Sequence, residues 1–129
     1  MSKAKALNDF WNSFFISAYE ENTQLEKIDP PVKFPYITYQ RVIDSFGSEI
    51  ALTASIWDKD RDGYSADLQN YKKAEEISKC IGHGGVFVPF EGGSLWVKRG
   101  SPFAQPMADT DRSIKRTVLN ISVEYITAD

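Results

Sequence analysis

The chain has 129 residues and a net charge of −3, with 42% hydrophobic, 13% aromatic and 26% charged residues. This composition predicts one folded domain over residues 1–129 with a substantial core, and it excludes general disorder. There is no basic stripe and no apolar run of about 20 residues, so specific nucleic-acid binding and a membrane role have little support.

The N-terminal residues have the spacing of an amphipathic helix. From Lys3 to about Glu21, apolar side chains recur at intervals of three and four: Leu7, Phe10, Trp11, Phe14, Phe15 and Ala18. We expect this face to be buried in the core, because an isolated amphipathic helix is only marginally stable in water. The alternative is a docking face for a partner.

A polar connector over residues 22–35 separates this helix from a predicted β-hairpin. The connector ends in IDPPVKFP, and its three prolines favour extended backbone. Apolar and polar residues then alternate over residues 36–44 and again over 49–57, which is the period of a strand. The segment SFGS at 45–48 supplies the turn, so the two strands are expected to pair antiparallel.

The stretch WDKDRDGYSADLQ at residues 57–69 begins like an EF-hand calcium loop. Asp58, Asp60, Asp62 and Gly63 match positions 1, 3, 5 and 6 of such a loop. Position 12, however, is Gln69 in place of the bidentate glutamate, and a strand instead of a helix precedes the loop. We therefore interpret the stretch as a strand-to-helix turn and keep a calcium site as the weaker hypothesis.

A second helix is predicted over residues 66–81. Ser65 is positioned to cap it and Asp67 to lie near its positive N-terminus, while Gly82 is placed to end it in the left-handed conformation. The expected apolar face consists of Leu68, Tyr71, Ala74, Ile77 or Ser78, and Ile81.

The last turn of this helix contains Cys80, and His83 follows it. Cys80 is the single cysteine, which cannot form an internal disulfide and fits synthesis in a reducing cytoplasm. We expect it to be a small packed residue and not a nucleophile, because no base accompanies it in a known motif. His83 is the single histidine and cannot supply a multi-histidine zinc site.

Residues 84–100 predict a second hairpin, with strands around 86–88 and 95–97 and a turn at EGG. Pro89 cannot donate a backbone hydrogen bond, so its strand is expected to have a free edge. Residues 100–113, GSPFAQPMADTDRS, show no period and are interpreted as a long loop. Its large apolar residues Phe103 and Met107 either fold back on the core or insert into a partner.

The segment IKRTVLNISVEYIT at residues 114–127 carries the strongest strand pattern. Apolar residues alternate along it, and its length predicts a central place in the sheet. The expected order is α-β-β-α-β-β-β, a mostly antiparallel sheet with helices packed on it, which belongs to the α+β class.

No pattern typical of an enzyme is present. The sequence contains no nucleophile–histidine motif, no phosphate-binding loop and no paired-histidine metal motif. We therefore expect no catalytic residue, no cofactor and no enzymatic activity.

Several segments together resemble the small tail terminator proteins of long-tailed phages and prophages of Gram-positive bacteria. These are FPYITY, ALTASIW, a helix ending in IG, GGSLWVKRGSPFAQPMAD and the C-terminal LNISVEYITAD, spanning roughly residues 34–129. The stretch WDKDRDGYSADL departs from the resemblance, because the turn between strand and helix is longer and more acidic than expected there.

The resemblance implies a structural virion protein, assembled in the host cytoplasm. It would form a ring, expected to contain six copies, on the head-proximal end of the tail tube, stop addition of the major tail protein and offer a surface to the head connector. The expected contact residues are Pro102, Phe103, Gln105, Met107, Gly92 and Gly93, and deletion of residues 102–108 is expected to abolish assembly without loss of the fold. The alternatives are a head-completion or neck adaptor protein and, in another class, a calcium-binding regulatory module.

Overall fold

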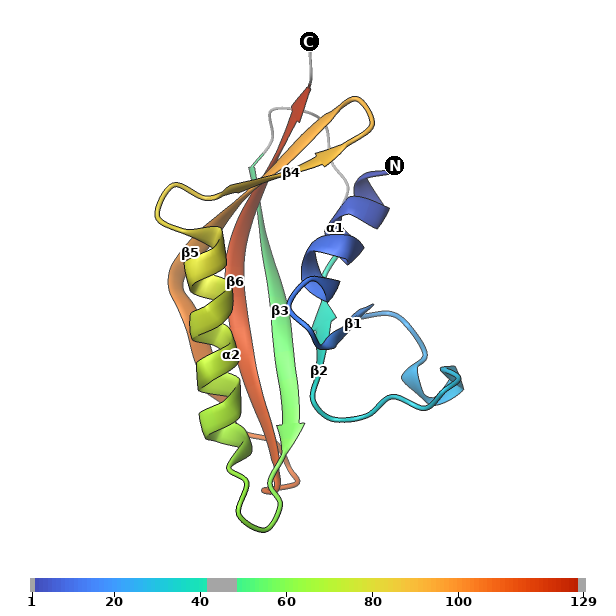
Figure 1. Ribbon diagram of the computed structural model, residues 1–129, viewed down its shortest axis with the longest axis vertical. Helices are drawn as coiled ribbons and strands as arrows, with labels where there is room; N and C mark the ends of the chain where they lie inside the picture. The colour runs from blue at the N-terminus through green and yellow to red at the C-terminus, as the bar shows by residue number, and fades with distance from the viewer. Residues whose placement is uncertain (1, 42–48, 128–129) are drawn as a thin grey trace.

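Both helices of this protein lie on the same face of one sheet. The computed structural model describes residues 2–41 and 49–127, and within them six strands form the sheet in the order β1-β2-β3-β6-β5-β4 (Figure 1). The elements in chain order are α1 (Lys3–Asn12), β1 (Ser17–Glu20), the 3₁₀ turn η1 (Leu25–Lys27), β2 (Tyr36–Tyr39), β3 (Glu49–Lys59), α2 (Ala66–Ile81), β4 (Val86–Phe90), β5 (Gly93–Met107) and β6 (Ile114–Thr127).

The sheet is antiparallel except at one edge. β1 runs parallel to β2, and every other neighbouring pair is antiparallel. The expected α+β class is confirmed, and so is the central place of residues 114–127, because β6 lies between β3 and β5. The predicted order lacked one element, the short strand β1 between α1 and β2.

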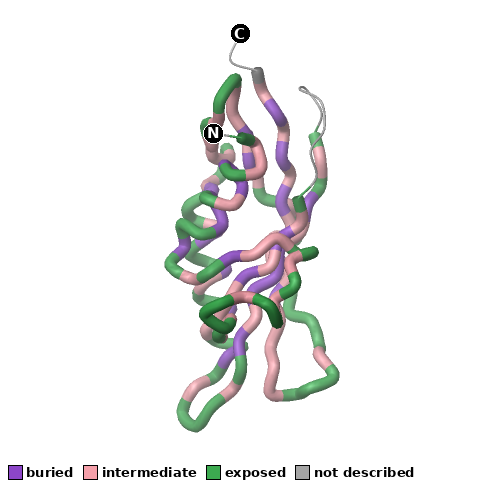
Figure 2. The backbone as a smooth tube through the Cα atoms, turned by 90° about the vertical axis from the view of Figure 1, so that its right-hand side faces the viewer, coloured by how far each residue is buried: buried purple, intermediate pink, exposed green. Residues whose placement is uncertain are grey.

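The core lies between this sheet and the two helices (Figures 1 and 2). Alternate residues of β6 face it and are at most 5% exposed: Thr117, Leu119, Ile121, Val123 and Tyr125. The period-two pattern predicted this face correctly, because successive strand residues point to opposite sides of a sheet.

The predicted N-terminal helix is too long by about nine residues. α1 ends at Asn12, whose side-chain oxygen accepts a hydrogen bond from the Ala18 backbone N–H at 2.9 Å and thereby helps to place β1. After Ser13, which caps the helix, the chain continues with three aromatic or β-branched residues, Phe14, Phe15 and Ile16. Such residues have low helix propensity. Phe14 is buried as expected, but Phe15 is 91% exposed, so its assignment to the buried stripe was wrong.

Helix α2 has the predicted limits, and its predicted face is confirmed at Ala74, Ile77 and Ile81 but not at its N-terminal end. Ser65 accepts a hydrogen bond from the Leu68 N–H, which confirms the cap, and Gly82 ends the helix with φ 74°. The ψ of Gly82 is 177°, so the backbone there is not the left-handed helical conformation that was expected. The buried residues are Ala66, Asn70, Ala74, Ile77 and Ile81.

Two residues expected to be inside on α2 are instead outside. Leu68 and Tyr71 are 48% and 64% exposed. Cys80, expected to be packed, is exposed as a free thiol. In the first half of α2, Ala66 and Asn70 meet the sheet in place of Leu68 and Tyr71, because the Asn70 side chain donates to backbone carbonyls of β3 and β6.

The expected long loop at residues 100–113 is mostly strand. Residues up to Met107 belong to β5 and pair with β6, after a register shift between Arg99 and Ala104. The bulge and the two prolines hide the period in the sequence, since a bulge shifts the alternation and proline is tolerated at a strand edge. The connection that remains covers residues 108–113.

The two predicted hairpins are confirmed in their pairing. β2 pairs antiparallel with β3, although β2 ends at Tyr39 and the predicted turn at 45–48 lies outside the described residues. β4 pairs antiparallel with β5 around Glu91 and Gly92, and Pro89 lies in β4, which forms an edge of the sheet as expected.

Candidate interaction surfaces

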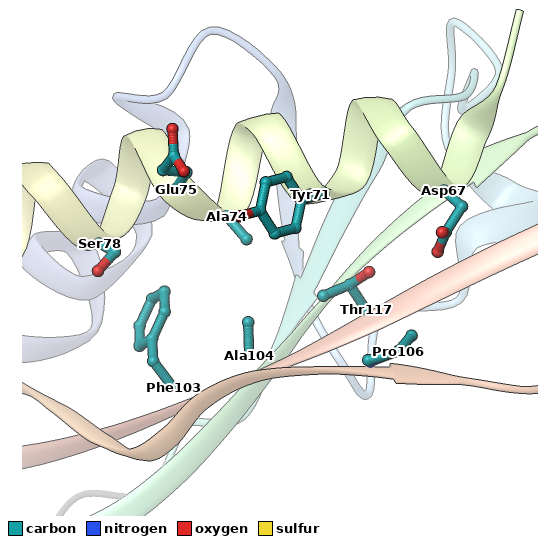
Figure 3. A pocket seen from close by; sticks show the side chains of 9 residues that line it. All are labelled: Asp67, Tyr71, Ala74, Glu75, Ser78, Phe103, Ala104, Pro106 and Thr117. Atoms are coloured by element: carbon teal, nitrogen blue, oxygen red, sulfur yellow. The ribbon is translucent and has the colours of Figure 1, made fainter.

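A groove separates α2 from the second half of β5. Its volume is about 300 Å³, and its lining is Asp67, Tyr71, Ala74, Glu75, Ser78, Phe103, Ala104, Pro106 and Thr117 (Figure 3). The two alanines face each other across its floor, while the rings of Tyr71 and Phe103 rise at its sides. The groove exists because the small side chains of Ala74 and Ala104 do not fill the space between the helix and the strand.

The second half of β5 is also an open strand edge. β4 pairs only with Gly93–Val97 of β5, so the outer side of residues 98–107 has no strand partner among the described residues. Pro102 and Pro106 lie on this stretch, and prolines on an edge limit uncontrolled pairing with other chains. The Pro102 carbonyl accepts a hydrogen bond from the Asn120 side chain at 3.0 Å, which ties the bulge to β6.

The six predicted contact residues fall in two places. Pro102, Gln105 and Met107 are exposed along the second half of β5, and Phe103 lines the groove, partly buried against the core. Gly92 and Gly93 lie at the other end, where β4 turns into β5, and Gly92 has φ 93°. The structure therefore does not bring the glycine tip and the Phe103 segment together.

The two large apolar residues of this segment have different surroundings. Phe103 folds back and packs against the core, whereas Met107 remains 49% exposed. Sequence reasoning missed four further exposed apolar residues, namely Phe15, Leu68, Tyr71 and Phe87. Phe15 lies beside the β1 edge, whereas Tyr71 lines the groove beside β5 and Phe87 lies on β4.

The sheet face away from the helices carries aromatic and cationic side chains. Tyr36 stacks on Trp57 with ring centroids 6.3 Å apart, and the Arg116 guanidinium lies 4.9 Å above Trp57. A similar set lies further along, where Phe87 stacks on Trp96 and the Lys98 ammonium lies 4.2 Å from the Trp96 ring. These contacts cover part of each ring, so this face is less apolar than its composition suggests.

One carboxylate on this face is held in its charged form. Glu49 accepts hydrogen bonds from Ser122 and from Lys98, whose ammonium lies 3.2 Å away. These hydrogen bonds, and after them the lysine charge, lower the pKa of Glu49 below its ordinary value.

The three aspartates of the predicted turn serve different partners. Asp58 is 1% exposed, and its carboxylate accepts from the Lys59 N–H at 2.8 Å and from the Tyr64 hydroxyl. Asp60 accepts from the Ala66 N–H at 2.9 Å, and Asp62 is exposed in a turn closed by Gly63 with φ 72°. The strand-to-helix interpretation agrees with this arrangement, because Asp58 and Asp60 bond to different groups and Asp62 is exposed.

Burial around Asp58 affects its tyrosine partner. The pKa of Tyr64 is raised, first by burial of the hydroxyl and then by its hydrogen bond to the Asp58 carboxylate, because both disfavour the phenolate. A small cavity of about 80 Å³ lies beside this pair and is also lined by Asn70 and Lys73. Asn70 donates to the backbone carbonyls of Ile56 and Lys115, at 3.4 and 3.2 Å, while its own Oδ1 has no hydrogen-bond partner among the described residues.

Over residues 2–41 and 49–127, no three His, Cys, Asp or Glu side chains gather as a metal site would require. No helix in the same part of the chain is long and apolar enough to cross a membrane. The groove, the open strand edge and the exposed apolar residues are the candidate interaction surfaces of this part of the chain.

Comparisons of the chain with protein families and with curated proteins find no match.

Proposed function

We propose that this protein is a tail terminator: a structural virion protein that forms a ring on the head-proximal end of a phage tail tube. It ends polymerisation of the major tail protein and presents a surface to the head connector. Its proposed place is the virion, and its proposed work is assembly without catalysis. The resemblance over residues 34–129 motivates the role of tail terminator. The exposed apolar residues, the open strand edge and the groove support the more general role in assembly.

One observation carries the proposal most. The large apolar side chains that remain exposed lie on both flanks of the molecule, with Phe15 beside the β1 edge and Tyr71 and Met107 beside β5. Two different patches on opposite flanks suit a heterologous contact, in which each copy meets its neighbour through unlike surfaces. Such contacts close into a ring when the rotation between copies allows it, and a ring of six is the stoichiometry we propose.

Electron microscopy of the protein mixed with subunits of a tail tube tests this proposal. We expect tubes that stop growing and carry extra density at one end. Tubes that elongate unchanged, with no protein at their ends, would contradict the proposed function. Attachment to the head vertex without attachment to tubes would instead identify a neck adaptor.

The assembly variants for that test are point substitutions. The deletion of residues 102–108 that the sequence suggested would remove a strand segment paired with β6, from Ala104 to Met107, so we expect it to disturb the fold as well as assembly. Met107→Ser and Gln105→Lys alter exposed side chains of the same segment and leave its pairing in place.

A further inference from the structure

Phe15 is the most exposed large apolar side chain of the described residues, at 91%, and its backbone has φ 68°. A left-handed backbone is unfavourable for a residue with a bulky side chain, and asparagine or glycine would suit the position better. Phe15 therefore combines an exposed ring with a strained backbone, and strain of this kind gathers at functional positions.

The turn that presents Phe15 is firmly held. Its neighbour Phe14 is 4% exposed and packs edge-on against Phe10, with ring centroids 5.3 Å apart. The Phe14 carbonyl accepts a hydrogen bond from the Lys73 ammonium at 2.8 Å. The backbone that carries Phe15 is thus tied to the core through Phe14 and to α2 through Lys73, while the Phe15 ring itself projects into solvent. A large exposed aromatic side chain on an anchored turn is a suitable anchor for a protein contact.

The α2–β5 groove has the properties of a receptor for such a ring. Its floor is Ala74 and Ala104, and the rings of Tyr71 and Phe103 flank the floor (Figure 3). At about 300 Å³ it is at the lower end of the range for ligand pockets, a size that accommodates one aromatic side chain.

The ring and the groove lie on different sides of α2. Lys73 of this helix points toward the Phe14 carbonyl, whereas Tyr71 and Ala74 line the groove beside β5. Figure 1 shows the same arrangement, with the end of α1 on one side of α2 and β5 on the other. Phe15 can therefore reach this groove only in another copy.

Charge complementarity favours a second copy as the occupant. The groove wall carries Asp67 and Glu75, the latter also 3.6 Å from Lys79 in an exposed pair. Lys33 is exposed, and it lies on the same flank as Phe15. The chain before β2 runs beside the chain before β1, since Ser17 pairs with Tyr36 in parallel register and Ile16 and Pro35 line one cavity.

We propose that Phe15 of one copy inserts into the α2–β5 groove of the next, with Lys33 facing Asp67 and Glu75 there. The contact is heterologous and repeats from copy to copy. It rests on the proposed ring and names the surfaces that form it.

Disulfide trapping tests the contact directly. The parent is Cys80→Ser, because the native thiol is exposed. In it, Phe15→Cys and Ala104→Cys together should give a ladder of covalent oligomers under oxidation, since each chain then has both halves of the contact. Oxidation accumulates even a transient encounter, so the absence of a ladder would overturn the proposal. Abundant dimers of the Phe15→Cys single variant without a ladder would also overturn it, because they indicate a symmetric contact.

Complementary variants test it without cross-links, with association followed by analytical ultracentrifugation. Phe15→Asn removes the ring at a position whose backbone suits asparagine, and Ala104→Trp fills the groove. Each should weaken self-association on the order of ten- to a hundredfold, whereas Phe15→Tyr retains it. A mixture of the two defective variants should form dimers and nothing larger, since one intact pair of surfaces remains. Larger species in the mixture, or undiminished association of either variant alone, would contradict the contact.

The charge contact has its own control. Lys33→Glu should weaken association, and adding Asp67→Lys in the same chain should restore it.

These results are separable from the proposed function. A ladder without capping of tail tubes would keep the contact and refute the terminator role. Capping by Phe15→Asn at the level of the unaltered chain would keep that role and refute the contact.

Discussion

The two helices cover the same face of the sheet, yet they fill the space beneath them differently. Phe10 and Trp11 of α1 and Phe14 just after it make mutual edge-on and tilted contacts, and Trp11 also stacks against Tyr39 with ring centroids 6.4 Å apart. α2 places Ala74 opposite Ala104 and leaves a groove. Side-chain volume at the facing positions decides whether a helix packs fully against a sheet or leaves a groove.

This contrast predicts where the stability of the protein is concentrated. The α1 side should be sensitive to any change of volume, and the groove side of α2 should tolerate it. Four substitutions or conditions probe the difference, in decreasing order of expected effect.

Removal of the largest buried side chain should have the greatest effect. Trp11 is 1% exposed, and Trp11→Ala should lower the free energy of unfolding by about 3–5 kcal/mol, because it deletes buried area and leaves a cavity. Tyr71→Ala, at a residue 64% exposed, is the control and should change it by less than about 0.5 kcal/mol. Urea unfolding followed by far-UV circular dichroism, which reports on the backbone and not on the deleted tryptophan, measures both. Equal losses would mean that the groove side is packed as tightly as the α1 side.

Enlarging an alanine on each side gives a matched comparison. Ala6 of α1 is fully buried against the core, so Ala6→Leu should lower the free energy of unfolding by about 1–3 kcal/mol through overpacking. Ala104→Leu extends into the groove and should change the free energy of unfolding by less than about 0.5 kcal/mol. Thermal and urea unfolding of the two variants decide the point, and a large cost at Ala104 would show that the groove is closed in solution.

The strained turn that ends the α1 region should respond in the opposite direction. Phe15→Asn should raise the free energy of unfolding by roughly 1 kcal/mol, because asparagine tolerates φ 68° and the lost ring is 91% exposed. Phe14→Asn is the control and should be strongly destabilising, since Phe14 is 4% exposed. Both variants are measured at a concentration at which the unaltered chain is monomeric, because self-association itself adds stability. A loss of stability in Phe15→Asn under that condition would indicate that the Phe15 ring contributes to the fold of the single chain.

The smallest effect concerns pH and the tyrosine beneath α1. Burial raises the pKa of Tyr39, although its hydrogen bond from Asn8 acts in the other direction. A raised pKa in the folded state means that this contribution to stability is complete below the ordinary value of 10.0 and is lost as pH rises through the folded pKa. The urea midpoint should therefore fall above pH 10, and less steeply in Tyr39→Phe. An identical slope in the variant would assign the alkaline loss to other tyrosines, of which Tyr36 and Tyr64 also have raised pKa values.

Local patterns were sufficient for much of the fold. The limits of α2, the hairpin of β4 and β5 and the alternating face of β6 were predicted from residues close together in the sequence. Each depends on a period, a cap or a turn residue, and these act over only a few positions. Among the predicted contact residues on β5, Pro102, Gln105 and Met107 are exposed and Phe103 lines the groove.

The features missed by sequence reasoning depend on distant partners. Phe15 shares the helical spacing of Phe14, and only the end of α1 at Asn12 and the β1–β2 pairing turn it outward. The signal available was the run of aromatic and β-branched residues after Asn12, which disfavours a helix. Asn70 likewise gave no sign of burial, because the carbonyls it bonds belong to β3 and β6.

The sequence by itself determined the kinds of element, the α+β class and the strand faces, because periodicity and caps are short-range properties. Tertiary structure alone decided that residues 100–107 join the sheet, which side of α2 meets it and where the groove opens. Pairing with β6 satisfies backbone groups that a loop would leave to water, and the sheet selects the helix face that its own side chains can accommodate.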